Sequence, residues 1–354
     1  MHSVPPRPSL ITHSTDFLRA ALLRGDWAEW LPSERMLCAR LRISRPTLRA
    51  VLVQLEKEGI IGKVEMKKRR ILVEQSGSGA ASQSRVIALL TPVPLQAMPP
   101  FVMFWVDALR GLLAEADFHL EVLASPQCFG AKAQSSLKKV TQRVPAAAWV
   151  LFRSTPAMQQ WFVAEELPVV IAGSCADDLM LPSVDLDYRA TCHHAAVTLR
   201  QKGHRHIALL LPDSGQGGDM ESALGFCEAL AGSGATASVV RHQESLAQVI
   251  EKLDALLRRK PPPTALLVAR SIHTLTVVTH LLRSGWQLPR DIAIISRDDD
   301  AFLSHVVPKI PRYSVDAGQF AKRISRLVLE LAQTGQTRVK PVRLIPELQR
   351  GETI

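Results

Sequence analysis

Short apolar runs alternate with longer segments of helical periodicity over most of this chain of 354 residues. The apolar runs have the length of buried strands and lie at 86–90, 120–123, 148–152, 169–172, 207–211, 237–240, 265–268 and 292–295. The segments with helical periodicity have the length of crossover helices and lie at 103–116, 131–142, 188–202, 219–232, 244–259, 272–284 and 316–332. Strands that alternate with helices form parallel sheets covered on both faces. The alternation predicts an α/β fold, and eight strands over roughly 270 residues predict two such lobes.

A segment without charge or apolar periodicity separates this part from the N-terminus. Residues 75–84, QSGSGAASQS, have the composition of a flexible linker. We therefore place one domain at 1–74, the linker at 75–84 and the two-lobed domain at 85–354. The first domain holds 14 Lys and Arg against 8 Asp and Glu, so it carries six of the ten net positive charges of the chain. A basic N-terminal domain favours a polyanionic partner.

The N-terminal domain shows the pattern of three helices and a hairpin. Ser44 stands where a side chain can cap the third helix, and Pro46 fits its first turn. This helix has apolar residues at helical spacing that must pack inward: Leu48, Val51, Leu52 and Leu55. Apolar residues at 60–64 and 71–73 flank a basic run at 67–70, which predicts a two-stranded wing with a basic tip. The order is that of a winged helix-turn-helix.

The third helix carries two arginines on the face opposite its apolar residues. Arg45 and Arg49 are four residues apart near the N-terminal end, where a guanidinium can enter the major groove and read a guanine. Ser44 and Thr47 can contact phosphates or a thymine methyl group, and Arg35, at the start of the second helix, is predicted to contact the DNA backbone. The wing is predicted to add contacts from Lys67, Lys68 and Arg69.

Residues 31–61, LPSERMLCARLRISRPTLRAVLVQLEKEGII, resemble the winged helix-turn-helix of the GntR family. That family repeats a P-S-E-R opening, an S-R-x-T-x-R recognition helix and an L-E-x-E-G-hydrophobic ending. The resemblance implies that DNA is contacted by Arg35, Arg45, Thr47 and Arg49. One departure concerns the wing: the family usually carries a glycine at its tip, where this chain has the run from Glu65 to Arg69.

The second part resembles the regulatory domain of the LacI/GalR family, which uses the type I periplasmic-binding-protein fold. The motifs that carry the resemblance stand in the family's order at residues 181–187, 203–209, 225–226, 263–265 and 288–292. The resemblance implies two lobes, one made of 85–187 with 312–333 and the other of 188–311. It also implies dimerisation. A small-molecule effector is expected in the cleft between the lobes, beyond the carboxyl ends of the strands.

Four charged residues follow strand ends and are candidate effector contacts: Arg153, Arg270, Arg297 and Asp298. By the resemblance, Asp298 stands where relatives place an aspartate that accepts hydrogen bonds from ligand hydroxyls, and a carboxylate can accept from two adjacent hydroxyls. Two interpretations stay open for Arg270 and Arg297, which are either ligand contacts or structural partners of the acidic residues 298–300. The family commonly has an arginine three residues before its Gly-Phe pair, where this chain has Ser222. A sugar or sugar derivative is expected, with an anionic ligand as the alternative.

The chain lacks the patterns of an enzyme. It has no nucleophile elbow and no dinucleotide or P-loop fingerprint, and the glycine-rich run at 215–219 is predicted to be a plain loop. Five scattered cysteines without a C-x-x-C pair predict neither a disulfide framework nor a zinc site, and the histidines at 193–194, 204 and 206 are weak metal patterns. We predict no catalytic residue, metal or cofactor. The alternatives are a small-molecule-handling enzyme or a transport binding protein on the same two-lobed fold.

No run of about 18 or more apolar residues occurs, and the first residues, MHSVPPRPSLITHS, lack the features of a signal peptide. We therefore expect a cytoplasmic protein without membrane contact. The predicted function is that of a ligand-responsive transcriptional regulator that binds a two-fold operator in double-stranded DNA as a homodimer. Because the resembling families are mostly repressors, the default expectation is a repressor of carbohydrate-related genes.

Overall fold

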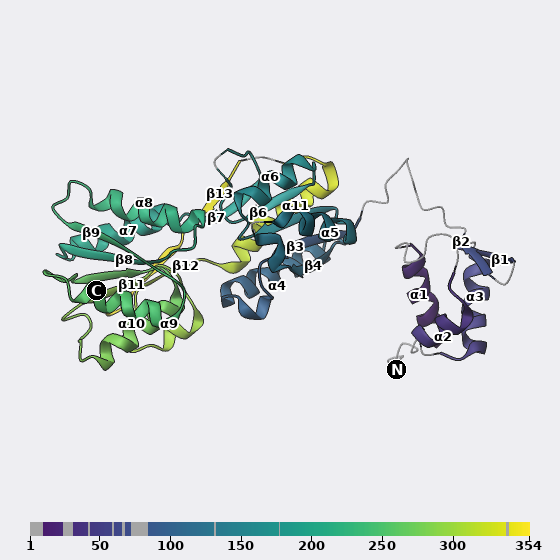
Figure 1. The fold of residues 1–354 in the computed structure, drawn as a ribbon, viewed down its shortest axis with the longest axis horizontal. Coiled ribbons are helices and arrows are strands. Elements are labelled where there is room, and N and C mark those ends of the chain that lie inside the picture. Colours follow the sequence, from purple (N-terminus) through teal and green to yellow (C-terminus); the bar gives the residue numbers. More distant parts are fainter. Residues whose placement is uncertain are drawn as a thin grey trace, which may run out of the picture. The chain divides into compact units, whose positions relative to one another are not determined.

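The computed structural model describes residues 10–23, 31–41, 43–58, 60–65, 68–71, 84–130, 132–176, 178–337 and 340–354. The chain divides into two compact units, Met1–Gln83 and Ser84–Ile354 (Figure 1). The predicted linker at 75–84 lies outside the described residues except for Ser84, which belongs to the second unit.

The first unit is a winged helix-turn-helix, as predicted. It consists of helices α1 (Leu10–Leu23), α2 (Glu34–Leu41) and α3 (Arg45–Lys57) and the antiparallel strands β1 (Ile61–Glu65) and β2 (Lys68–Ile71). Ser44 caps α3 by accepting a hydrogen bond from Thr47 N–H at 3.3 Å, and Pro46 lies in the first turn, where no N–H partner is needed. The apolar face predicted for α3 is buried and packs against Leu18 of α1 and Leu37 of α2.

The second unit contains two six-stranded sheets, one in each lobe. The strands of the first lobe are β3 (Val86–Thr91), β4 (His119–Ala124), β5 (Ala148–Phe152), β6 (Val169–Ala172), β7 (Ser183–Leu186) and β13 (Val342–Leu344). Those of the second lobe are β8 (His206–Pro212), β9 (Thr236–His242), β10 (Ala265–Val268), β11 (Ala293–Ser296), β12 (Arg312–Ser314) and β14 (Glu347–Gln349). The strand orders are β13-β7-β6-β5-β3-β4 and β14-β12-β11-β10-β8-β9. The described pairs are parallel except for the edge pair of β12 with β14.

Helices cover both faces of each sheet. The first lobe has α4 (Pro100–Ala114), α5 (Ala133–Arg143), α6 (Pro156–Ala164) and α11 (Ala317–Thr334), and the second has α7 (Tyr188–Gln201), α8 (Gly217–Leu230), α9 (Leu246–Leu257) and α10 (Ser271–Arg283). In the first lobe α4 and α11 share a core with one sheet face, and α5 and α6 with the other. In the second lobe α7 and α8 lie on one face, and α9 and α10 on the other (Figure 1). Short 3-10 turns occur at η1 (Leu95–Ala97), η2 (Pro126–Phe129) and η3 (Ala301–His305).

The chain passes between the lobes after β7, after β12 and after β13. This path corrects one expectation, because residues 312–314 do not belong to the first lobe. Strand β12 pairs with β11, where Arg312 lies opposite Ser296, and Tyr313 is buried in the core of the second lobe. Helix α11 does belong to the first lobe, where Phe320 and Ile324 are part of the core.

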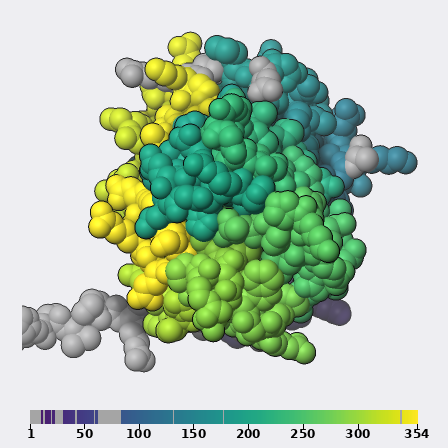
Figure 2. Space-filling model, turned by 90° about the vertical axis from the view of Figure 1, so that its left-hand side faces the viewer, coloured from purple at the N-terminus to yellow at the C-terminus, as the bar shows by residue number. Residues whose placement is uncertain are grey.

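The last described residues complete the second lobe. Thr353 is buried, its Oγ1 donates to the Ile294 carbonyl oxygen at 2.7 Å, and its own carbonyl oxygen accepts from Ile294 N–H at 2.9 Å. In Figure 2 the C-terminal residues, in yellow, run along the surface of the green second lobe. No helix within the described ranges combines the length and the apolar character that crossing a membrane requires.

Candidate DNA-binding helix and effector site

Helix α3 separates an apolar face from a charged one. The Arg45 side chain is exposed, and Arg49 keeps 69% of its side-chain surface exposed. Arg49 Nε lies 3.4 Å from Glu34 Oε2 of α2. An exposed pair of this kind contributes little to stability, so another anion can replace the glutamate. Arg35 is also exposed, at the start of α2.

Ser44 and Thr47, whose hydroxyl groups are predicted to contact DNA, stabilise the first turn of α3. Ser44 Oγ and Thr47 Oγ1 lie 2.7 Å apart, in addition to the cap that Ser44 provides. This turn is the part of α3 from which Arg45 emerges. Of the predicted wing contacts, Lys67 lies outside the described residues, as do the side chains of Lys68 and Arg69 in β2.

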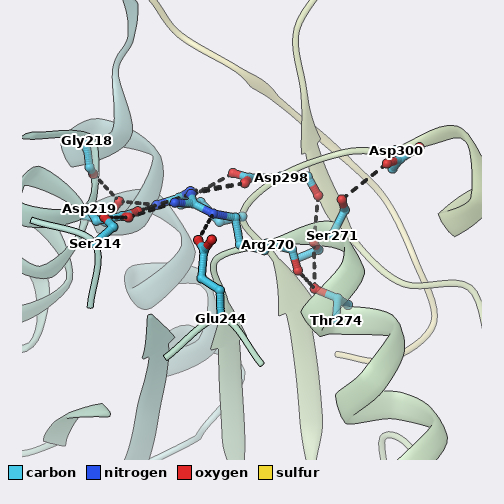
Figure 3. Close-up of polar contacts among 12 residues, drawn as sticks. Ser214, Gly218, Asp219, Glu244, Arg270, Ser271, Thr274, Asp298 and Asp300 are labelled. Atoms are coloured by element: carbon cyan, nitrogen blue, oxygen red, sulfur yellow. Dashed lines mark hydrogen bonds and ion pairs between the residues drawn. The ribbon is translucent and has the colours of Figure 1, made fainter. Parts of the chain in front are cut away.

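A cluster of charged residues lies at the carboxyl ends of the strands of the second lobe (Figure 3). Arg297 follows β11 directly, and its side chain is fully buried. Its Nε and Nη2 donate to the two carboxylate oxygens of Asp298 at 2.8 and 3.1 Å. Its Nη1 donates to Asp219 Oδ1 at 2.8 Å and to Ser222 Oγ at 2.9 Å, and the guanidinium lies 4.3 Å from the centroid of the Tyr188 ring. Burial acts to lower the pKa of Arg297, but the charge of Asp298 holds it well above its ordinary value.

Asp219, in the first turn of α8, joins Arg297 to Arg270. This aspartate is buried and accepts from Arg270 Nη1 and Nη2 at 3.2 and 2.8 Å. It also accepts from Ser214 Oγ at 2.5 Å. Burial alone would raise the pKa of Asp219, but the charges of the two arginines hold it below its ordinary value. Figure 3 shows Glu244 beside Arg270, with Glu244 Oε1 at 3.5 Å from Arg270 Nε.

The structure identifies the partners of the acidic residues 298–300. Asp298 binds Arg297, Asp299 accepts from Arg312 Nε at 2.5 Å, and Asp300 accepts from Ser271 Oγ at 3.4 Å. Arg297 is therefore a structural partner of this triplet. Arg270 is bound mainly by Asp219 instead, and it keeps a weaker contact of 3.8 Å from its Nη1 to Asp298 Oδ2.

Asp219 was not singled out from the sequence, although the predicted helix at 219–232 begins with it. The plain loop predicted at 215–219 was wrong for Gly217 and Gly218, which begin α8. An acidic residue in the first turn of a helix that follows a parallel strand is the signal that could have found it.

Arg153 is the candidate from the first lobe. It follows β5 with a φ of 56°, in the left-handed region, and its side chain is half-buried. It makes no hydrogen bond or ion pair with the part of the chain that the structure describes, and its guanidinium lies 5.7 Å from the centroid of the Phe152 ring. Burial lowers the pKa of Arg153, and the charge of Arg270 lowers it further. Arg153 therefore lies within electrostatic reach of Arg270 in the second lobe.

Two buried histidines lie beside this cluster and were not singled out from the sequence. His242, at the end of β9, and His273, in the first turn of α10, have ring centroids 4.7 Å apart. His242 Nδ1 carries a proton, because it lies 3.0 Å from the carbonyl oxygen of Gln243. Burial lowers the pKa of His273, and the neighbouring His242 lowers it further, to about 4. The described residues contain no group of three or more His, Cys, Asp or Glu that could hold a metal ion.

These histidines predict a second unit that is sensitive to mild acid. His273 stays neutral in the folded protein while the unfolded chain takes up its proton near about pH 6.5, so stability falls by up to about 2 kcal/mol between about pH 7 and about pH 5. Thermal melting of His273→Gln is expected to show a smaller pH dependence in this range. His193→Gln, at an exposed position of α7, is the control and should behave as the wild type. The same pH dependence in all three proteins would contradict the prediction.

Two family profiles match the chain. Residues 15–70 match the bacterial regulatory proteins of the gntR family. Residues 196–354 match the periplasmic binding protein-like domain. The first match covers the winged helix-turn-helix, and the second covers most of the second lobe and the C-terminal segments.

Curated relatives are transcriptional regulators. The HTH-type transcriptional regulator CelR of Thermobifida fusca is 26% identical over 172 residues, which are 46% of this chain and 48% of CelR. Catabolite control protein A of Priestia megaterium is 27% identical over 166 residues, which are 43% of this chain and 48% of that protein. The chain thus spans about half the length of these relatives.

Solved structures share the fold. A LacI regulator from Bacillus cereus subsp. cytotoxis NVH 391-98 has a TM-score of 0.70 at 17% identity and covers 77% of this chain and 98% of its own. The transcriptional regulator CelR in complex with cellobiose has a TM-score of 0.68 at 18% identity, with 98% of this chain and 100% of that chain covered. The chain therefore joins a segment that matches the gntR family model to one that matches the periplasmic binding protein-like model, and it shares its fold with solved LacI-family regulators.

Proposed function

We propose that this protein is a ligand-responsive, DNA-binding transcriptional regulator. The observation that carries the proposal is helix α3, whose apolar face is buried while Arg45 and Arg49 are exposed next to a capped first turn. The match of this unit to the gntR family and the regulator relatives support the same function. The relatives and fold neighbours are regulators, which disfavours the alternative of a small-molecule-handling enzyme.

On DNA, α3 is proposed to enter the major groove with its N-terminal end. There the guanidinium groups of Arg45 and Arg49 read guanines, and Arg49 exchanges its exposed contact with Glu34 for a base. Phosphate and minor-groove contacts are proposed for Arg35, Ser44, Thr47, Lys67, Lys68 and Arg69. We propose that two copies bind a two-fold operator as a homodimer in the cytoplasm.

Between the lobes, the effector is proposed to bind near Arg153, Arg270 and Asp298, with Arg297 positioning Asp298. A ligand that prefers one arrangement of the lobes increases the population of that arrangement. The change alters the placement of the two winged helices in the dimer and hence the affinity for the operator. The cellobiose in the CelR structure supports a sugar or sugar derivative as effector and carbohydrate-related genes as targets of repression.

Gel-shift titration and footprinting on the neighbouring promoter test the regulator function. We expect specific protection of a short two-fold site, and we expect Arg49→Ala to weaken specific binding by about 1–3 kcal/mol because a bidentate contact to a base is lost. The control is Lys57→Ala, which removes an exposed charge from the opposite end of α3 and should weaken binding less. Absence of specific protection, or an equal loss in both variants, would count against the proposal.

A further inference from the structure

We infer that the effector is anionic, and that its carboxylate or phosphate group binds between Arg153 of the first lobe and Arg270 of the second. This inference rests on the proposed function, because it names the chemical class of the ligand that the interlobe site takes. It is carried by the ion-pair arrangement of the site, by a buried N–H of Arg270 that makes no hydrogen bond with the described residues, and by the start of helix α10.

Two carboxylates of the cluster, those of Asp298 and Asp219, are already occupied by side chains of this chain. Both oxygens of Asp298 accept from Arg297, and Asp219 accepts from Arg297, Arg270 and Ser214. Asp298 also has only 25% of its side chain exposed. The oxygens of Asp298 and Asp219 already accept hydrogen bonds from side chains of the protein. They therefore have fewer free lone pairs to accept from the hydroxyls of a neutral sugar.

Arg153 makes no ion pair with a carboxylate among the described residues, and the charges of Glu244 and Asp219 act on it only from beyond ion-pair distance. Arg297 and Arg270 are balanced by the carboxylates of Asp298 and Asp219. The acid beside Arg270, Glu244, keeps 51% of its side chain exposed and lies 3.5 Å from Arg270, not from Arg153. Because a half-buried cation without a partner is costly, a ligand that brings a negative charge to Arg153 gains affinity.

Arg270 offers the complementary half of the site. Its Nε is buried and makes no hydrogen bond with the described part of the chain, although it forms an ion pair with Glu244 Oε1 at 3.5 Å. Arg270 is also the residue that precedes α10, a helix of 13 residues whose N-terminus has no side-chain cap. The first N–H groups of α10 and its dipole favour an anion at this end. Buried His273, in the same turn, has an Nδ1 atom that makes no hydrogen bond with any residue in the described ranges.

An anion between the two arginines would also link the lobes. Arg153 and Arg270 repel each other across the junction, and the repulsion is strongest when the lobes are close. A bound carboxylate or phosphate replaces this repulsion by two attractions. The ligand therefore stabilises the arrangement in which the lobes are together, which is the differential interaction that a ligand-driven population shift requires.

Thermal melting of the full chain, without DNA, tests the inference with three probes at matched ionic strength: inorganic phosphate, D-glucuronate and D-glucose. We expect phosphate or D-glucuronate to raise the melting temperature by a few degrees and D-glucose to leave it unchanged. The two anions separate a phosphate site from a carboxylate site. In Arg153→Gln the affinity for the active anion should fall about tenfold or more, because a charged hydrogen bond is lost.

Two further variants make the result specific. Arg153→Lys keeps the charge and should keep part of the response, while Arg326→Gln, at an exposed position of α11 in the first lobe, should keep all of it. A response to D-glucose equal to that of D-glucuronate, no response to either anion, or an unchanged response in Arg153→Gln would overturn the inference. Because DNA is absent, such a failure leaves the gel-shift test of the regulator function independent.

Discussion

Asp219→Ala is expected to destabilise the second unit by about 3–5 kcal/mol, the cost of removing one partner from a buried ion pair. Asp219 is 2% exposed and binds two arginines, one of them fully buried. Without it, Arg297 keeps Asp298, but Arg270 loses its main partner and stays beside Arg153. The expected fall in melting temperature is roughly 10 °C.

Urea unfolding of Asp219→Ala and a matched control measures this effect. Asp213→Ala is the control, because Asp213 is an exposed aspartate in the same connection between β8 and α8, and its loss should change stability by less than about 0.5 kcal/mol. Asp219→Asn separates charge from shape, because asparagine keeps one hydrogen-bonding oxygen and loses the negative charge. Its free energy of unfolding should lie between those of Asp219→Ala and Asp213→Ala. If Asp219→Ala unfolds at the same urea concentration as Asp213→Ala, the ion-pair network does not stabilise the lobe.

Gly225→Ala is expected to destabilise the same lobe by about 1–3 kcal/mol, although alanine is the better helix former. A Cβ atom at Gly225 of α8 would lie 2.1 Å from the carbonyl oxygen of Arg189 in α7 and 2.8 Å from its carbonyl carbon. Both atoms belong to the backbone, so no side chain can rotate to make room. The two helices must separate, and this shift moves Tyr188 and Asp219 relative to Arg297.

Gly111→Ala is a control that should change stability in the opposite direction. Gly111 lies within α4, and a Cβ there would meet nothing within 4 Å. Alanine should therefore stabilise the first lobe by about 0.5–1 kcal/mol through its helix propensity. Calorimetry of the two variants should show shifts of opposite direction, and a stabilised Gly225→Ala would show that α7 and α8 do not pack as closely as described.

The sequence predicted strands with continuous apolar runs and missed the three-residue strands at or next to the sheet edges. The runs 148–152, 169–172 and 265–268 match β5, β6 and β10 at both ends, because strands buried on both faces need continuous apolar residues. Strands β12, β13 and β14 have three residues each, too few for a periodicity, and they exist because neighbouring strands pair with them. Strand β7 and helix α6 were missed as well, and Asp185 makes β7 less apolar than a typical buried strand.

For the interlobe site, the sequence indicated positions but not partners. Arg270 and Asp298 come together because they follow the neighbouring parallel strands β10 and β11, a consequence of topology alone. The pairing of Asp219 with arginines 51 and 78 residues away depends on how α8 packs, which no local pattern records. That Arg297 occupies both oxygens of Asp298 is likewise visible only with side chains in place. The roles of these residues toward a ligand stay predictions.

A ribosome synthesises a chain from its N-terminus, so the two units of this protein can begin to fold at different times. The core of the winged helix is closed by residues up to 61, all close together in sequence. The first lobe needs β13 at 342–344, and the second needs β14 and Thr353. The first lobe is therefore incomplete until residue 344 has been synthesised, and the second until residue 353. During each round of translation, the segment that we propose binds DNA can fold before the part of the molecule that would control it.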